Sequence, residues 1–318
     1  MPSAAFIFPG QGSQVVGMGA ELAARFAKSK ECFERASTVL GYDLLERVNS
    51  ASPDELKETR LSQPAIFTAN VAIYRAVATL GLNPIASAGH SFGEYCSLTI
   101  ADAIDFDEAV RIVNERGLAM GDAADVAPGL MAAIIGLEEA AVDEVCKRAR
   151  EESGARVDIG NLNSVVQIVV SGDASAVEAA CEIAKERGAK RVRVLNVSGA
   201  WHSTLMEAAM PRFSRAVASA TLRMPSFTVI SNVIAKPYTS VDEIRTCLLA
   251  SLCSRVRWHE AALALAALTP DYIVECGASE VLAPMIKRLP NIGSARVLHV
   301  ADVAGLEDLR ETLRSVTA

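Results

Sequence analysis

A short apolar run at residues 85–88 leads directly into Gly89-His90-Ser91-Phe92-Gly93, and a helical segment follows. Glycines on both sides of a serine allow a sharp turn from a buried strand into a helix, where bulkier residues would clash. Such a turn presents the serine hydroxyl as a nucleophile. The pattern therefore predicts a strand–turn–helix unit with Ser91 as the candidate nucleophile. An ordinary glycine-flanked turn is the alternative.

Strand and helix signals alternate along most of the chain, which favours an α/β fold with a mostly parallel sheet covered by helices. The expected strands are 4–8, 85–88, 229–231 and 272–274. The expected helices include 64–80, 260–268 and 305–315.

The middle of the chain follows a different pattern. Strands are expected at 130–136, 156–161, 167–171 and 190–194, with helices at 138–150 and between Asp173, as N-cap, and Gly188. This β-α-β-β-α-β order is the ferredoxin-like split motif. We therefore predict a small domain, residues 128–196, inserted into a large domain formed by residues 1–127 and 197–318.

Composition excludes several classes of protein. The 318 residues include 31 Lys and Arg against 38 Asp and Glu, a net charge of −7, which argues against a dedicated nucleic-acid binder. The uncharged stretch 76–93 contains Gly81, Asn83 and Pro84 and is not a membrane span. Seven scattered cysteines without a C-x-x-C pair indicate neither a disulfide framework nor a zinc site. We expect a cytoplasmic protein without a metal or other cofactor.

A serine nucleophile needs a base, usually histidine, and the chain has four. His90 is adjacent to Ser91 and its side chain should point away, whereas His259 and His299 fit packing or surface positions. His202 lies in a turn of small residues after a strand, and elimination makes it the best candidate.

The loop Phe8-Pro9-Gly10-Gln11-Gly12 fails as a phosphate loop, because the third glycine of G-x-G-x-x-G would fall at Val15 and no G-K-[ST] follows. It is better suited to supply a backbone N–H to an oxyanion hole, together with the N–H of Phe92.

Several motifs occur together in one order: FPGQGSQ from Phe8, QPAI from Gln63, GHSFGEY from Gly89, Arg116 in ERGLAM, PGLMAAIIGL, NLNS and GAWHS. The chain resembles the malonyl-CoA:acyl carrier protein transacylases and the acyltransferase domains of polyketide synthases. The resemblance covers nearly the whole chain. It implies an α/β-hydrolase-like large domain with an inserted ferredoxin-like domain.

The resemblance also implies roles for individual residues. Ser91 is the nucleophile, His202 its base, and the backbone amides of Gln11 and Phe92 form the oxyanion hole. Arg116 offers a bidentate guanidinium to the free carboxylate of a malonyl group. Apart from the resemblance, the sequence would favour a charged residue on the surface of a helix at this position. The remaining pocket residues implied are Gln63, Met120 and Asn161.

The chain departs from the family pattern at three places. Trp201 stands where Phe is frequent, and its larger ring should tighten the pocket around the acyl α-carbon and favour malonyl over branched units. Ser251 replaces a Gln whose backbone carbonyl orients the histidine, so the exchange is expected to be harmless. The segment 164–167 lacks the usual Pro-Gly, so that turn should differ.

One basic cluster contrasts with the acidic whole, with five cations against Glu186: Lys185, Arg187, Lys190, Arg191 and Arg193. It is either a solvated helix end or a docking site for an acidic carrier protein. Lys287 and Arg288 are candidates for contacting the phosphates of CoA.

We therefore expect a discrete, monomeric enzyme that moves a malonyl group from malonyl-CoA to a holo acyl carrier protein by a ping-pong mechanism. The alternatives are an acyl hydrolase of the same fold and a non-catalytic carrier-docking protein. Arg116 argues against the hydrolase, because a buried cation without a partner would not help it bind neutral acyl chains. Fatty-acid and polyketide synthesis require the same residues here.

Overall fold

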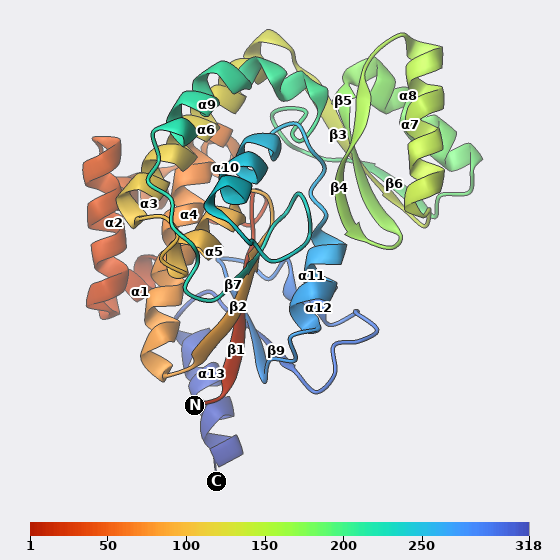
Figure 1. The fold of residues 1–318 in the computed structure, drawn as a ribbon. Helices are drawn as coiled ribbons and strands as arrows, with labels where there is room; N and C mark the ends of the chain where they lie inside the picture. Colours follow the sequence, from red (N-terminus) through yellow and green to blue (C-terminus); the bar gives the residue numbers. More distant parts are fainter. Residues whose placement is uncertain (318) are drawn as a thin grey trace.

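The computed structural model describes residues 1–317 and contains two β-sheets (Figure 1). The larger sheet has the order β7-β2-β1-β8-β9, and all its neighbouring strands run parallel. Its strands are β1 (Ser3–Phe8), β2 (Asn83–Gly89), β7 (Thr228–Ile230), β8 (Tyr272–Cys276) and β9 (Arg296–Val300). The predicted fold class, a mostly parallel α/β sheet beside a second small sheet, is confirmed.

Alternate residues of β1 point into two separate cores. Phe6 and Phe8 pack in the core on one face of the sheet, and Ala5 and Ile7 pack in the core on the other. Helices therefore cover both faces. These helices are α1 (Ala20–Arg25), α2 (Ala27–Leu40), α3 (Leu44–Ser50), α4 (Thr59–Val77), α5 (Gly93–Ile100), α6 (Phe106–Val126), α9 (Met210–Ala218), α10 (Val241–Ala250), α11 (Trp258–Ala266), α12 (Ala283–Ile286) and α13 (Val303–Thr317).

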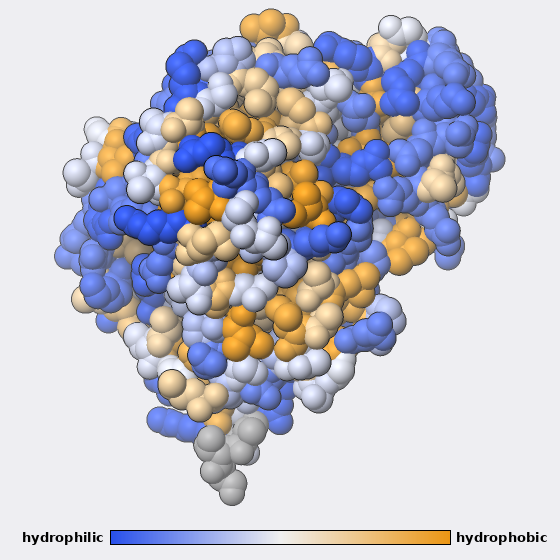
Figure 2. All heavy atoms as spheres, in the orientation of Figure 1, coloured by the Kyte–Doolittle hydropathy of each residue, from blue (hydrophilic) through white to orange (hydrophobic). Residues whose placement is uncertain are grey.

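The smaller sheet is antiparallel and has the order β4-β5-β3-β6. Its strands are β3 (Gly129–Ile135), β4 (Val157–Ser164), β5 (Gln167–Asp173) and β6 (Arg191–Val194), with α7 (Glu139–Ser153) and α8 (Ala174–Glu186) packed on it around a third core. Figure 1 shows this unit projecting from one side of the molecule, and Figure 2 shows its outer face as mostly hydrophilic. The division into residues 128–196 and the two flanking segments stays a prediction.

The prediction that Asp173 is the N-cap residue of α8 is confirmed for its position. Asp173 occupies the N-cap position, but its side chain forms no capping bond to the helix. Pairing of β4 with β5 instead brings Arg156 beside it, and the carboxylate accepts hydrogen bonds from the backbone N and the Nε of Arg156 at 2.8 and 3.2 Å. A charged partner has replaced the helix N–H groups as donor.

Strand β4 forms one outer edge of the small sheet and faces the large one. The backbone N–H of Val256 donates to the carbonyl of Gly160 at 2.8 Å, and the N–H of Leu162 donates to the carbonyl of Val256 at 2.8 Å. The two halves of the protein are thus joined by backbone pairing. Among residues 1–317, no helix is long and apolar enough to cross a membrane.

Candidate active site

The carboxyl ends of β1, β2 and β7 meet at one edge of the parallel sheet, the usual ligand-binding edge of such folds. Ser91 follows β2 there with a left-handed backbone, φ 55°. A Cβ on Gly89 would lie 2.0 Å from the carbonyl carbon of Gly93, and a Cβ on Gly93 would lie 2.3 Å from the carbonyl oxygen of Phe8. Only glycine fits either position, which explains the predicted turn.

Asn232, just after β7, holds the strained turn in place. Its side chain accepts a hydrogen bond from the Ser91 N–H at 3.2 Å and donates one to the Ser91 carbonyl at 3.0 Å. The buried Glu94 in turn accepts from the Asn232 backbone N–H at 2.9 Å and from the Tyr238 hydroxyl at 2.7 Å. Such strain persists where surrounding contacts determine the backbone, as they do here.

The His202 imidazole lies beside the nucleophile. Its Nε2 is 2.8 Å from Ser91 Oγ, and its Nδ1 is 2.8 Å from the carbonyl oxygen of Ser251. A carbonyl only accepts, so Nδ1 carries the proton and Nε2 is left to accept the serine proton. The backbone carbonyl occupies the place that a carboxylate takes in a Ser-His-Asp triad, and it stands at the predicted residue.

Burial, together with the positive charge of Arg116, lowers the pKa of His202 to about 3. The imidazole is therefore neutral at neutral pH, as a base must be before it accepts a proton.

Arg116, on α6, is buried in the same site and lacks an acidic partner. One guanidinium nitrogen donates to Gln63 Oε1 at 2.8 Å, another lies 3.4 Å from Ser91 Oγ, and Nε has no hydrogen-bond partner. No ion pair is formed by Arg116 within residues 1–317. Burial lowers its pKa from the usual value, yet the group stays cationic. A buried, uncompensated cation beside a nucleophile favours an anionic ligand.

A cavity of about 170 Å³ joins these groups. It is smaller than the roughly 300–1,000 Å³ of pockets for drug-sized ligands, which suits a short acyl group. Strands of the small sheet and the loops that follow β1 and β2 of the large sheet contribute to its wall. The predicted site residues lining it are Gln11, Ser91, Arg116, Met120, Asn161, Trp201 and His202.

Two predicted residues lie behind the cavity wall. Gln63 positions Arg116 and also donates to the Thr59 hydroxyl at 2.8 Å. The Phe92 ring is buried with its centroid 6.0 Å from the Arg116 guanidinium carbon. Within the described chain, the backbone N–H groups of Gln11 and Phe92 donate to no other group and are free to bind an oxyanion.

The predicted docking cations lie outside the cavity: Lys185, Arg187, Lys190, Arg191 and Lys287. Lys185 pairs with Glu182 at 2.6 Å and Lys287 with Glu280 at 2.9 Å. Surface pairs of this kind are weak, so both charges still contribute to the local field.

Asn232 and Glu94 were not predicted from the sequence, and neither were the partners of His90. Asn232 could have been found because it directly follows a strand that ends at the same sheet edge. The half-buried His90 ring packs on Trp258, with its Nε2 2.9 Å from Asn163 Oδ1, and a local motif gives no signal for such a contact.

The chain is similar to known proteins over nearly its whole length. Residues 5–306 match the family described as "Acyl transferase domain". The chain is 40% identical over 300 residues to the malonyl CoA-acyl carrier protein transacylase of Escherichia coli (strain K12), covering 94% of this chain and 96% of that protein. It is 37% identical over 314 residues to the protein of the same name from Bacillus subtilis (strain 168), covering 99% and 98%.

Solved structures are similar over the same length. The malonyl CoA-acyl carrier protein transacylase of Coxiella burnetii superposes with a TM-score of 0.92 at 38% identity, covering 98% of each chain. A malonyl-transacylase in complex with a type II polyketide acyl carrier protein superposes with a TM-score of 0.90 at 37% identity, covering 98% and 99%. The chain therefore belongs to the acyl transferase family, with the malonyl CoA-acyl carrier protein transacylases.

Proposed function

We propose that this protein transfers the malonyl group of malonyl-CoA to the phosphopantetheine thiol of an acyl carrier protein through an acyl-enzyme on Ser91. The observation that carries the proposal is Arg116, a buried cation without a carboxylate partner, 3.4 Å from the nucleophile. A malonyl carboxylate supplies the missing charge, and its thioester carbonyl then lies near Ser91.

In the first half-reaction, His202 Nε2 accepts the Ser91 hydroxyl proton while Oγ attacks the thioester carbonyl carbon. The oxyanion is stabilised by the amides of Gln11 and Phe92. When the carbonyl re-forms, the C–S bond breaks, and the CoA thiolate takes the proton from His202. A malonyl ester of Ser91 remains.

The second half-reaction repeats these steps with another thiol. The carrier thiol gives its proton to His202, and the sulfur attacks the ester carbonyl. The C–O bond to Ser91 breaks, and Oγ takes the proton back. The enzyme returns to its starting state, so one base serves both thiol partners.

Substrate and carrier recognition depend on residues around the catalytic pair. Gln63 orients Arg116, whereas Met120, Asn161 and Trp201 shape the acyl pocket, where the Trp201 ring disfavours branched malonyl units. The basic cluster at residues 185–193 faces an acidic carrier protein, and Lys287 lies toward CoA. We propose a monomer, because one chain supplies every residue of the site. We place it in the cytoplasm, where the seven free thiols stay reduced.

The direct test is intact-mass measurement after mixing with malonyl-CoA. We expect one added malonyl group, which moves to a holo acyl carrier protein when that protein is supplied. Stronger labelling by acetyl-CoA or a longer acyl-CoA contradicts the assignment of Arg116. Rapid loss of the label to water in the presence of the carrier protein indicates the hydrolase instead.

The lowered pKa of His202 leads to a prediction on pH dependence. A histidine with the usual pKa of about 6.5 would lose roughly 25-fold in its neutral fraction between pH 7 and pH 5, whereas His202, with a pKa of about 3, stays neutral. We expect kcat/KM for malonyl-CoA to change less than about twofold over this range. In Arg116→Ala the pKa of His202 should rise, so the acid limb of the loading rate should move toward neutral pH.

The same shift affects stability. Between pH 6.5 and pH 3 the unfolded chain protonates this imidazole and the folded chain does not, so its stabilising contribution is complete above pH 6.5 and is lost as the pH falls toward 3. A kcat/KM that halves near pH 6.5 in the wild-type enzyme contradicts the predicted pH dependence of activity.

Replacing Asn232 by alanine should misplace the nucleophile. Both side-chain bonds to the strained Ser91 backbone are lost, so we expect kcat to fall by about tenfold or more. The free energy of unfolding should fall by about 1–3 kcal/mol. Stopped-flow transfer kinetics and urea denaturation provide the two measurements.

Ser87→Ala is the matched control for Asn232→Ala. The Ser87 hydroxyl is buried on the same strand and bonds the Phe6 carbonyl at 2.9 Å and the Ser97 hydroxyl at 2.8 Å, away from Ser91. It should lose stability while kcat is kept. Equal losses of kcat in the two variants would show that Asn232 has no positioning role.

A further inference from the structure

The backbone of His202 is as strained as that of Ser91. Its φ is 61°, in the left-handed region that residues with a side chain rarely adopt. The turn that contains it is closed locally by Ser203, whose hydroxyl donates to the Ala200 carbonyl at 2.7 Å and accepts from the Leu205 N–H at 3.3 Å. These bonds shape the turn, but they do not fix its place relative to the rest of the site.

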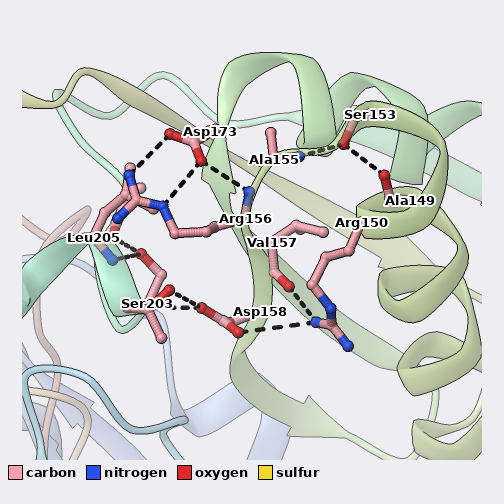
Figure 3. A network of polar contacts seen from close by, with 12 residues as sticks. Ala149, Arg150, Ser153, Ala155, Arg156, Val157, Asp158, Asp173, Ser203 and Leu205 are labelled. Carbon is pink, nitrogen blue, oxygen red and sulfur yellow. Dashed lines mark hydrogen bonds and ion pairs between the residues drawn. The ribbon is translucent and has the colours of Figure 1, made fainter.

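Asp158, on β4 of the small sheet, supplies that fixed point. Its Oδ2 accepts hydrogen bonds from both the backbone N–H and the hydroxyl of Thr204, each at 2.9 Å. Figure 3 shows Asp158 extending from its strand toward the Ser203–Leu205 turn. An ionised acceptor makes these bonds stronger than neutral ones. Thr204, which Asp158 holds in this way, lies two residues after His202 in the sequence.

The same strand also contacts the other segments of the site. Val256, which pairs with Gly160 and Leu162 of β4, lies five residues after Ser251, whose carbonyl orients the imidazole. Asn163, near the end of β4, bonds His90, the residue before the nucleophile. Strand β4 thus contacts three segments of the site: the one that contains the nucleophile, the one that contains the base, and the one whose carbonyl accepts a hydrogen bond from the base.

We propose that Asp158 is a positioning residue that holds the loop of His202 in register with Ser91. It acts through Thr204 and touches no substrate. The inference rests on the proposed function, because register matters only if Ser91 and His202 react together. It also gives the small sheet a role beyond walling the cavity, since that sheet aligns the base with the nucleophile.

The surroundings of Asp158 make the proposal testable. Its side chain is 31% exposed, and its nearest cation, Arg150, is 4.0 Å away. Replacement therefore leaves no unpaired charge in the interior. The Arg150 guanidinium keeps its own bond to the Val157 carbonyl at 2.6 Å. The main contacts removed with the carboxylate are the two to Thr204.

The experiment compares Asp158→Ala, Asp158→Asn and the control Asp173→Ala. Asp173 belongs to the same polar network, but its carboxylate binds Arg156 within the small sheet (Figure 3). We expect Asp158→Ala to lower kcat of malonyl transfer about 10- to 100-fold with KM for malonyl-CoA within about twofold. Asp158→Asn keeps an acceptor oxygen and should recover most of kcat. Asp173→Ala should lower the melting temperature as much as Asp158→Ala does, or more, and should leave kcat unchanged.

Three outcomes overturn the proposal: an unchanged kcat in Asp158→Ala, equal losses of kcat in Asp158→Ala and Asp173→Ala, or no recovery in Asp158→Asn. If Asp158→Ala does not fold, Thr204→Val removes only the hydroxyl bond and should lower kcat about 3- to 10-fold in the same direction. Unchanged kcat in that variant also overturns the proposal.

A second readout separates this inference from the function. Phenylmethylsulfonyl fluoride sulfonylates an activated serine oxygen with release of fluoride, and needs no malonyl group. Its rate of labelling Ser91 should fall in Asp158→Ala and hold in Asp173→Ala. If the wild-type protein is labelled by this reagent but takes no malonyl group, the proposed function fails while the positioning of His202 is still tested.

Discussion

Ser91→Ala is expected to take up no malonyl group, and its transfer rate should fall by at least about 10⁴-fold. The variant removes only the oxygen that forms the ester, since alanine adopts the left-handed backbone at φ 55° about as readily as serine does. Asn232 still bonds the backbone at position 91. Intact-mass measurement after incubation with malonyl-CoA should show the unmodified chain alone.

The base should behave as a unit with the nucleophile. His202→Ala is expected to lose nearly as much activity, and the double variant should lose no more than the worse single variant, because neither group works without the other. Multiplying losses would mean that the two side chains act independently, contrary to their 2.8 Å contact. Ser87→Ala, with its buried hydroxyl away from the site, controls for folding.

Arg116→Ala should change which acyl group is loaded. Removing one partner of a desolvated charge pair costs about 2–5 kcal/mol, so malonyl loading should fall about 30- to 5,000-fold relative to acetyl loading. Acetyl loading should hold or rise, because the charge that depresses the pKa of His202 is removed. Parallel loading assays with malonyl-CoA and acetyl-CoA measure the ratio.

Arg116→Lys separates charge from geometry. Lysine keeps a cation but lacks the planar fork that grips a carboxylate with two bonds, so its malonyl-to-acetyl ratio should fall between those of the wild type and Arg116→Ala. Folding should survive either change, since an uncompensated buried charge does not stabilise the wild-type protein. Equal losses for both acyl groups would make Arg116 a structural residue.

The sequence predicted those parts of the fold that depend on local patterns. Strands β1, β2 and β8 appeared as short apolar runs bounded by turn residues, and the succession of strands and helices along residues 128–196 was predicted from the same kind of local pattern. The predicted start of α4 at residue 64 was five residues late: the helix starts at Thr59 and contains Pro64, a residue that is more usual in the first turn of a helix.

The site was predictable where one motif contained both the residue and its geometry. Ser91 lies between two glycines that no other residue can replace, so the motif alone located it. His202 was reached only by elimination and resemblance, because the contact between residues 91 and 202 depends on tertiary structure. Asn232 and Asp158 act through single side chains placed by the packing of distant strands, and no local spacing reveals them.

The pairing of Val256 along β4 also protects the small sheet from aggregation. A free outer strand offers a row of unpaired N–H and C=O groups on which another chain can add. At the β4 edge, Val256 pairs with Gly160 and Leu162 and occupies part of this row. At the other edge, β6 is only four residues long, exposed and rich in arginine, which discourages such addition. A fragment cut out at the predicted boundaries, residues 128–196, would lack Val256 and leave the Gly160 carbonyl and the Leu162 N–H unpaired at the edge of β4, so we expect it to self-associate more readily than the whole chain.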